Sequence, residues 1–273
     1  MKVLCSGEVY FDPIETESCL ACAYSKRQPP CGYSYPILKA MFFSQEGDSR
    51  AAEVHVTDLT RCLLQAYLDK VDPQPKYVHE LLVLTIGVAL QKYAEWACAT
   101  DHEIRVEVPV SDAGIVGRID FLYPNGDIED LKTTRWLEGS YQLPYGNHSE
   151  QINTYANIIG SDGNLYVSYV DVTGPPRCQK YVNKHKCNSM AVMQDGVIVC
   201  PTCQVASPRQ HLGSKVVEAK HDPGMYSWMK ERAQLLALAL QTKTAPEAEP
   251  GWGCAYCLHV KSCTIGSIYM EAK

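Results

Sequence analysis

The chain has 273 residues, 46% of them hydrophobic and 21% charged, a composition typical of a globular protein with one large domain or two small ones. The formal net charge of −6 argues against a uniformly basic nucleic-acid-binding protein but allows a local basic groove. Thirteen cysteines, an odd number, and no signal-peptide pattern after Met1 favour a cytoplasmic chain with reduced, metal-binding thiols over a secreted disulfide protein. We find no run of about 18 to 20 apolar residues, and so expect no membrane span.

The first half of the chain changes from an irregular to a regular pattern. Residues 1–50 are rich in Cys, Tyr and Pro and have little periodicity, which predicts an irregular segment held together by metal. Helical periodicity begins at Thr57, and a longer helix is expected over about Tyr77–Ala99. Alternation with a period of two then predicts an antiparallel run of three strands: Ile104–Val110, Gly114–Tyr123 and Asp127–Thr134.

The second half alternates helices and strands around one interruption. The expected elements are a helix over about Ser149–Ile159, strands over Leu165–Val172 and Ser214–Ala219, and a long helix after Asp222–Pro223. A cysteine-rich stretch, Pro175–Leu212, separates the two strands, and a Pro/Glu linker over Ala245–Gly251 leads to the last cysteines. These elements predict an α/β core of helices around a sheet.

Most of the cysteines fall into three sets. The first set is Cys5, Cys19, Cys22 and Cys31, and the second is Cys178, Cys187, Cys200 and Cys203. Each contains a C-x2-C pair, a spacing that points two thiolates at one ion, so we expect a structural zinc site in each, with His185 as an alternative to Cys178. The third set, Cys254, Cys257 and Cys263, offers only three ligands, and His259 is the local candidate for a fourth.

Two acids and a lysine form the candidate catalytic group. Asp130 and Lys132 lie on one face of a predicted strand, and a three-residue turn at Pro124–Gly126 would place Asp120 directly opposite Asp130. Two such carboxylates can hold Mg²⁺ or Mn²⁺, which would stabilise charge on a phosphodiester, while Lys132 holds or deprotonates the attacking water. The simpler alternative is a surface ion pair between Asp130 and Lys132.

The pattern around these residues resembles the RecB-like branch of the PD-(D/E)XK nuclease superfamily. It consists of a Gly117-x-x-Asp120 strand, a tight turn, an Asp130-x-Lys132 strand and a helix carrying Gln151 and Tyr155. The resemblance implies a PD-(D/E)XK nuclease core, a mixed central sheet flanked by helices, with cysteine-rich metal-binding additions. It also implies that Asp120 and Asp130 bind the metal, that Lys132 is the general base, and that Gln151 and Tyr155 face the site and the DNA.

The cysteines resemble those of one group within that branch, the nucleases with an iron–sulfur cluster, which include the CRISPR-adaptation exonucleases. That group has one cysteine before the core and a C-x2-C-x5-C set after it. Cys62 matches the first, and Cys254, Cys257 and Cys263 match the second. The resemblance implies a [4Fe–4S] cluster on these four thiolates, with zinc as the alternative. Cys98 remains as a core thiol.

One position departs from the family pattern. The family places a His four residues after a Gly in the helix before the strands, and Gln91 stands there in this chain, after Gly87. The Gln91 carbonyl could contact the metal or its water, and Glu95 or, less well placed, His79 could replace it. This departure supports a competing hypothesis, a protein that binds DNA ends or a partner without cleaving.

The sequence thus predicts four segments: residues 1–56 (cysteine-rich, zinc), 57–174 (nuclease core, first part), 175–212 (zinc-ribbon-like insert) and 213–273 (closing helix and iron–sulfur set). The predicted function is a metal-dependent exonuclease on single-stranded DNA ends, in repair, recombination or CRISPR adaptation, with protein partners from such a complex. The insert is locally basic, and Arg135 and Trp136 are further candidate DNA contacts. A zinc-only adaptor is the third hypothesis.

Overall fold

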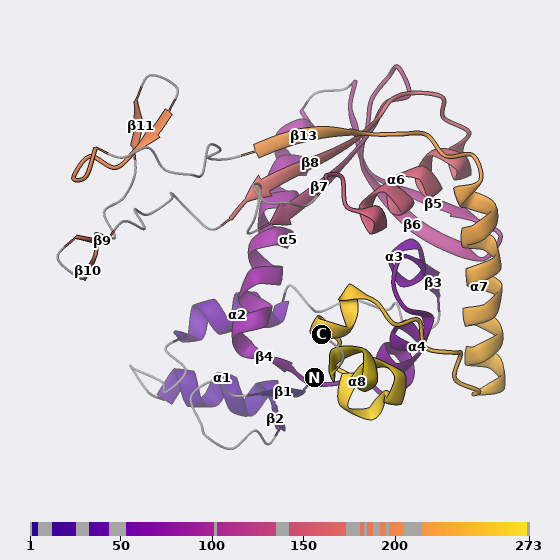
Figure 1. The fold of residues 1–273 in the computed structure, drawn as a ribbon, viewed down its shortest axis with the longest axis horizontal. Coiled ribbons are helices and arrows are strands. Elements are labelled where there is room, and N and C mark those ends of the chain that lie inside the picture. Colours follow the sequence, from indigo (N-terminus) through magenta and orange to yellow (C-terminus); the bar gives the residue numbers. More distant parts are fainter. Residues whose placement is uncertain are drawn as a thin grey trace.

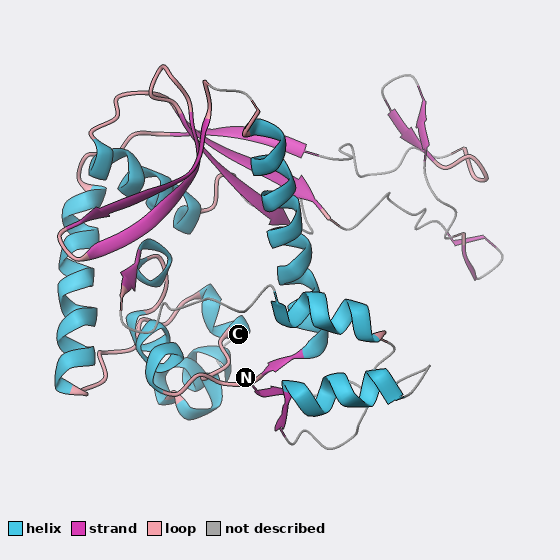
Figure 2. Ribbon diagram, turned by 180° about the vertical axis from the view of Figure 1, so that it is seen from behind, coloured by secondary structure: helices cyan, strands magenta, loops and turns pink. Residues whose placement is uncertain are grey.

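The computed structural model describes residues 2–4, 13–25, 33–43, 53–100, 103–134, 142–172, 181–182, 185–187, 192–194, 197–204 and 214–271. Its centre is a mixed sheet of six strands with helices packed around it (Figures 1 and 2). The strands of this sheet are β3 (Val54–His55), β5 (Arg105–Asp112), β6 (Ile115–Leu122), β7 (Ile128–Thr134), β8 (Leu165–Asp171) and β13 (Ser214–Ala219). The predicted α/β class is confirmed, and the strands foreseen from the alternation are present within a few residues.

The sheet forks at β6. One edge of β6 pairs along its length with β5. Its other edge is shared, because β3 pairs with Ile115 and Val116 while β7 pairs only with Phe121 and Leu122. After Glu129, which pairs with Phe121, strand β7 separates from β6. It continues parallel to β8, which in turn pairs antiparallel with β13. The short β3 and the parallel pairing of β7 with β8 are features that alternation alone did not predict.

Five helices pack against the sheet or against one another near it: α3 (Val56–Leu59), α4 (Leu63–Val71), α5 (Val78–Cys98), α6 (Gly146–Ile159) and α7 (Met225–Thr242). The main core lies between the sheet and α6, where Ile119, Ile152 and Leu165 have no exposed surface. Helix α7 packs on α4 and α6 and closes this side (Figure 1). The C-terminal segment adds two 3₁₀ turns, Trp252–Tyr256 and Val260–Ser262, and then α8 (Thr264–Glu271).

The N-terminal region is more regular than the sequence suggested. It contains β1 (Lys2–Leu4), β2 (Pro13–Glu15), α1 (Thr16–Ser25) and α2 (Tyr35–Phe43), and β1 pairs in parallel with β4 (Lys76–Tyr77). A second apolar cluster holds it together and includes Val78 and Leu81 of α5. The prediction of an irregular segment was therefore wrong, because apolar residues among the cysteines form a small core that is continuous with α5.

The insert between β8 and β13 projects away from the sheet (Figures 1 and 2). Its described strands form two short hairpins: β9 (Tyr181–Val182) with β10 (His185–Lys186), and β11 (Val192–Gln194) with β12 (Val197–Val199).

The length and hydropathy of helix α5 differ from the expectation that the chain has no segment resembling a membrane span. The window Leu81–Cys98 has the length and hydropathy of a span, and 11% of that window is buried. The same helix lies against β5, β6 and β7, and its Gln91 side chain hydrogen-bonds to the sheet. The apolar window therefore lies in a helix that packs beside the sheet.

Candidate active site and cysteine clusters

The turn between β6 and β7 sets the register of the candidate catalytic residues. Tyr123 N–H donates to Asp127 O at 2.9 Å and Gly126 N–H donates to Tyr123 O at 3.0 Å, so the loop has the three residues that we expected. Gly126 has φ +88°, a backbone conformation that favours glycine. Phe121 pairs with Glu129, and continuing this register places Asp120 opposite Asp130 at the fork of the sheet.

At the fork, the Asp120 side chain accepts a hydrogen bond from the backbone of β7. Its Oδ2 accepts the N–H of Leu131 at 2.8 Å, and its Oδ1 accepts Nε2 of Gln91 at 2.8 Å. The side chain is 7% exposed. Burial and the neighbouring Asp130 raise the pKa of Asp120 to about 7, because a second negative charge in a buried site is unfavourable.

Asp130 is more deeply buried, with 1% of its surface exposed. Its Oδ2 lies 2.7 Å from Lys132 Nζ and has no other donor among the described residues, and its Oδ1 accepts Nε2 of Gln151 at 3.1 Å. Burial raises the pKa of Asp130, and Lys132 opposes this shift. The carboxylate of this pair is buried and its lysine is partly exposed in the cavity wall, so the pair differs from an ordinary surface ion pair.

Gln151 and Tyr155 lie on the face of α6 that meets the fork. Gln151 Nε2 also donates to Tyr155 OH at 3.0 Å, and Tyr155 is 3% exposed. A Cβ atom at Gly117 would come within 2.5 Å of the Tyr155 ring, so the glycine of the Gly117-x-x-Asp120 pattern makes room for this tyrosine. Gln151 therefore touches a candidate metal ligand, whereas Tyr155 supports Gln151 from a buried position.

Gln91 presents its amide nitrogen to the acids. Besides Asp120, Nε2 donates to Glu107 Oε1 at 3.0 Å. Glu107 is the acid that our reading of the sequence missed. It lies on β5 opposite Asp120, with φ +51°, and pairs with Arg118 and Lys92. The register of β5 against β6 was the available signal, since positions 107 and 120 follow from the neighbouring pairs.

Glu95 and His79 are the alternatives to Gln91 as a metal contact. Glu95 is 7% exposed, its Oε1 has no hydrogen-bond partner in the described part of the chain, and its Oε2 pairs with Lys92 at 2.8 Å. Burial raises the pKa of Glu95. Glu95 thus remains a candidate ligand beside Gln91. The side chain of His79 and residues Arg135 and Trp136 lie outside the described residues.

A cavity of about 570 Å³ adjoins this site. One part of its wall is formed by Lys132, His148 and Gln151. Another part is formed by the four predicted cluster ligands, Cys62, Cys254, Cys257 and Cys263. The fold therefore brings Cys62, at the N-terminus of α4, to the three C-terminal cysteines.

Backbone N–H groups surround these four sulfur atoms. Glu249 donates to Cys62 at 3.3 Å, Gly251 to Cys254 at 3.4 Å and Gly266 to Cys263 at 3.3 Å. The backbone of His259 donates to Cys257, although burial raises the pKa of the Cys257 thiol overall. Such donors stabilise thiolates, and four of them in one cavity suit a cluster with four sulfur ligands.

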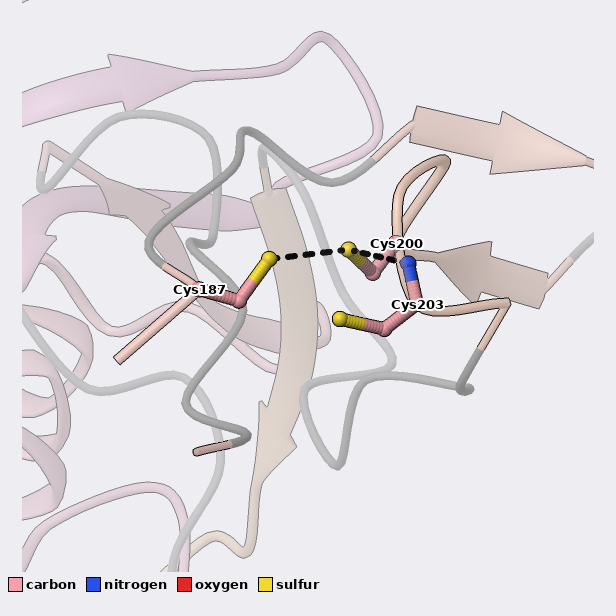
Figure 3. A group of neighbouring side chains, drawn as sticks. All are labelled: Cys187, Cys200 and Cys203. Carbon is pink, nitrogen blue, oxygen red and sulfur yellow. Dashed lines mark hydrogen bonds between the residues drawn. The ribbon is translucent and has the colours of Figure 1, made fainter. Parts of the chain in front are cut away.

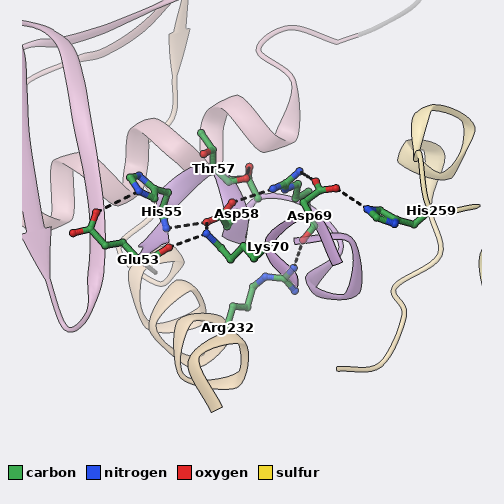
Figure 4. Close-up of polar contacts among 10 residues, drawn as sticks. Glu53, His55, Thr57, Asp58, Asp69, Lys70, Arg232 and His259 are labelled. Atoms are coloured by element: carbon green, nitrogen blue, oxygen red, sulfur yellow. Dashed lines mark hydrogen bonds and ion pairs between the residues drawn. The ribbon is translucent and has the colours of Figure 1, made fainter. Parts of the chain in front are cut away.

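Charged side chains fasten the C-terminal segment over the cavity. Figure 4 shows His259, which is 3% exposed, with Nε2 2.8 Å from Asp69 Oδ1 on α4. Asp69 also pairs with Arg61 at 2.5 Å. The buried Arg232 of α7 donates to Leu59 O and Arg61 O and pairs with Glu249. His259, our local candidate for the fourth ligand, is thus held by Asp69, away from that role.

The insert contains a second group of thiols. The sulfur atoms of Cys187, Cys200 and Cys203 lie within 4.8 Å of one another, with Cys187 and Cys200 3.8 Å apart (Figure 3). Tetrahedral Zn–S bonds of about 2.3 Å place sulfurs about 3.8 Å apart, so these three fit one zinc ion. Cys178 and the side chain of His185, the alternatives for the fourth ligand, lie outside the described residues.

The N-terminal cysteines are described only in part. Cys19 and Cys22 lie on α1, with Cys19 buried in the second apolar cluster and Cys22 half-buried. Cys5 and Cys31 lie outside the described residues. The N-terminal zinc site stays a prediction. Cys98, at the end of α5, is half-buried.

A solved structure shares this fold, and two others align less well. SSO0001 aligns with a TM-score of 0.51 and 14% identity, over 84% of this chain and 94% of that chain. An alkaline exonuclease from Laribacter hongkongensis (LHK-Exo) aligns with a TM-score of 0.39 and 9% identity, over 71% of this chain and 91% of that chain. A phage-related exonuclease from Haemophilus somnus 129PT aligns with a TM-score of 0.41 and 12% identity, over 70% of this chain and 94% of that chain. The first likeness concerns the fold, and the other two are too low to bear on function.

Sequence comparison identifies the family. The sequence matches none of the curated proteins. A family model described as the PD-(D/E)XK nuclease superfamily, however, matches residues 39–264, which include the fork, the insert and the four cysteines of the cavity. The chain therefore belongs to the PD-(D/E)XK nuclease superfamily.

Proposed function

We propose that this chain is a Mg²⁺- or Mn²⁺-dependent deoxyribonuclease that acts as an exonuclease on single-stranded ends. The observation that carries the proposal is the pair of buried, opposed carboxylates at the fork, with Lys132 beside them. Two adjacent buried acids whose pKa values are both raised favour a divalent cation between them. The preference for single-stranded ends rests on the resemblance to RecB-like exonucleases.

The residues of the chain have distinct roles in this proposal. Asp120 and Asp130 would hold the cation, which supplies charge stabilisation for the phosphodiester when bound. Lys132 Nζ, fixed by Asp130, positions the attacking water and takes part in its deprotonation. Gln151 orients Asp130, and Tyr155 fixes Gln151. Gln91 orients Asp120 through its amide nitrogen.

The four-cysteine cavity is proposed to hold a [4Fe–4S] cluster, with zinc as the competing occupant. Four thiols in one cavity, each with a backbone donor, support a four-thiolate ligand set. The iron–sulfur assignment itself rests on the resemblance of the cysteine spacing. We further propose zinc at Cys178, Cys187, Cys200 and Cys203, supported by the three clustered sulfurs, and at the N-terminal set.

The proposed setting is cytoplasmic, on DNA ends in repair, recombination or CRISPR adaptation. The cytoplasmic location rests on the odd cysteine count and the expected reduced thiols, whereas the DNA processes and the protein partners rest on the resemblance. A second candidate function, end binding without efficient cleavage, is favoured by Gln91, which offers the acids a donor where the family offers an imidazole ligand.

The test uses purified full-length protein with labelled single- and double-stranded oligonucleotides. We expect Mn²⁺ or Mg²⁺ to support degradation from single-stranded ends, and a chelator or Asp130→Asn to abolish it. Binding without metal-dependent cleavage would favour the second function, and undiminished cleavage by Asp130→Asn would overturn the first. An absorbance spectrum and metal analysis of the same protein separate iron from zinc, because a zinc protein is colourless.

A further inference from the structure

His148 lies on α6, one turn before Gln151, in the wall of the cavity that also contains Lys132. The ring is half-buried and lies beside two tyrosines, Tyr145 and Tyr169. An imidazole thus lines the same cavity as the candidate catalytic lysine, close enough for Lys132 to act on its charge.

The hydrogen bonds of Tyr169 determine which ring nitrogen carries the proton. Tyr169 OH accepts the backbone N–H of Tyr145 at 3.1 Å and lies 2.8 Å from His148 Nδ1. Tyr169 has no exposed surface, and Nδ1 is the acceptor available to its hydroxyl among the described residues. The hydroxyl therefore donates to Nδ1, which leaves the proton of a neutral imidazole on Nε2.

The other ring nitrogen is available to a ligand. Within the described ranges, the His148 side chain makes no hydrogen bond besides the one through Nδ1, and Nε2 is not among the buried atoms that lack a partner. Nε2–H is thus a donor open to the cavity. Burial and then the nearby Lys132 lower the pKa of His148 to about 4, so the imidazole is neutral at physiological pH.

A neutral donor suits this position. Lys132 already supplies a positive charge, and a second cation beside it would be unfavourable. A fixed N–H group can still stabilise an anionic oxygen, because the hydrogen bond forms without changing the charge of the site. The anion that the proposed function brings to Lys132 is the phosphate of a DNA strand.

We propose that His148 is a catalytic residue that donates an Nε2–H hydrogen bond to a non-bridging oxygen of the bound phosphate. The inference rests on the proposed nuclease function and adds a substrate contact to the same site. Tyr169 is the positioning residue, since its hydroxyl fixes the tautomer and the ring orientation.

The test compares two amide substitutions. Gln places a donor near the position of Nε2, whereas Asn reaches only the position of Nδ1. We expect His148→Asn to lower kcat by about 10- to 100-fold, the effect of losing a hydrogen bond to a charged group, and His148→Gln to restore part of it. His221→Asn, at a histidine bonded to Gly163 O and outside the cavity wall, is the matched control and should cleave normally.

A sulfur substitution separates contact from structural support. Replacing one non-bridging phosphate oxygen by sulfur should slow the native protein in one diastereomer, and His148→Asn should lose that discrimination. Equal discrimination in both proteins, with equal thermal unfolding, would overturn the contact. If Asp130→Asn still cleaves, the nuclease proposal itself fails; if it does not cleave but His148→Asn cleaves normally, only the His148 proposal fails.

Discussion

The carboxylate fork and the four-cysteine cavity are adjacent, yet they are built over very different distances along the chain. Asp120 and Asp130 face each other across one hairpin with a three-residue loop. Cys62 meets Cys254, Cys257 and Cys263 only because α4, α7 and the C-terminal segment pack together. A local register fixes the first site, whereas the complete fold fixes the second.

The largest expected effect separates the two sites. Asp130→Asn should lower cleavage by about 1,000-fold or more, because it removes a proposed metal ligand and the partner of Lys132. The absorbance of the cysteine site and its metal content should stay unchanged. The measurement pairs a nuclease assay with a spectrum of the same sample, and a loss of colour would show that the two sites depend on each other.

The converse change addresses the cavity. Cys62→Ser should remove the iron–sulfur absorbance and lower the midpoint of thermal unfolding by about 10 °C, as expected for a loss of a few kcal/mol in a chain of this size. Cys98→Ser is the matched control, since Cys98 lies outside the cavity wall, and it should keep both properties. Unchanged colour in Cys62→Ser would exclude Cys62 as the fourth ligand.

The sequence predicted the fork better than the cavity. The alternating strands predicted Asp120 opposite Asp130 on the condition of a three-residue loop at Pro124–Gly126, and the structure has that loop. Glu107 was missed because its left-handed backbone and its place on the next strand depend on the β5–β6 register. Cys62 could be chosen only by resemblance, since no local pattern links it to residues nearly two hundred positions away. The helices of the N-terminal region were missed because its cysteines obscured its apolar positions.

Alanine substitutions at two glycines test whether a clash near the candidate active site lowers its activity. A Cβ at Gly117 would lie 2.5 Å from the Tyr155 ring, and one at Gly163 would lie 2.3 Å from the backbone of Gly126. Each alanine substitution should lower the free energy of unfolding by about 2 kcal/mol, measured by chemical denaturation. Both variants should also cleave more slowly at a temperature where they are folded. Gly117→Ala acts through Tyr155, which supports Gln151, and Gly163→Ala acts through the turn that sets the register of the acids. Unchanged cleavage by Gly117→Ala would contradict the support that Tyr155 gives.

A further prediction is a pH dependence of stability in the metal-free protein. The folded-state pKa of Asp120, about 7, lies above its ordinary value of 3.8. Between these values the folded protein binds the proton more tightly than the unfolded chain, so stability falls as pH rises from about 4 to 7. Asp120→Asn should flatten this part of the curve, and Mn²⁺ should restore stability near pH 7. A curve unchanged by Asp120→Asn would rule out Asp120 as its source.

The separation of Cys62 from Cys263 also has a consequence for the order of biosynthesis. The fork is complete in sequence once Tyr155 has been added, but the cavity needs Cys263, 108 residues later. At about 5 to 20 residues per second, a ribosome takes roughly 5 to 20 s to make that stretch. During this interval the nascent chain carries the acids and lysine of the fork while Cys62 still lacks its three companions. An mRNA truncated after β13 would therefore encode a chain that has every fork residue but only one of the four thiols.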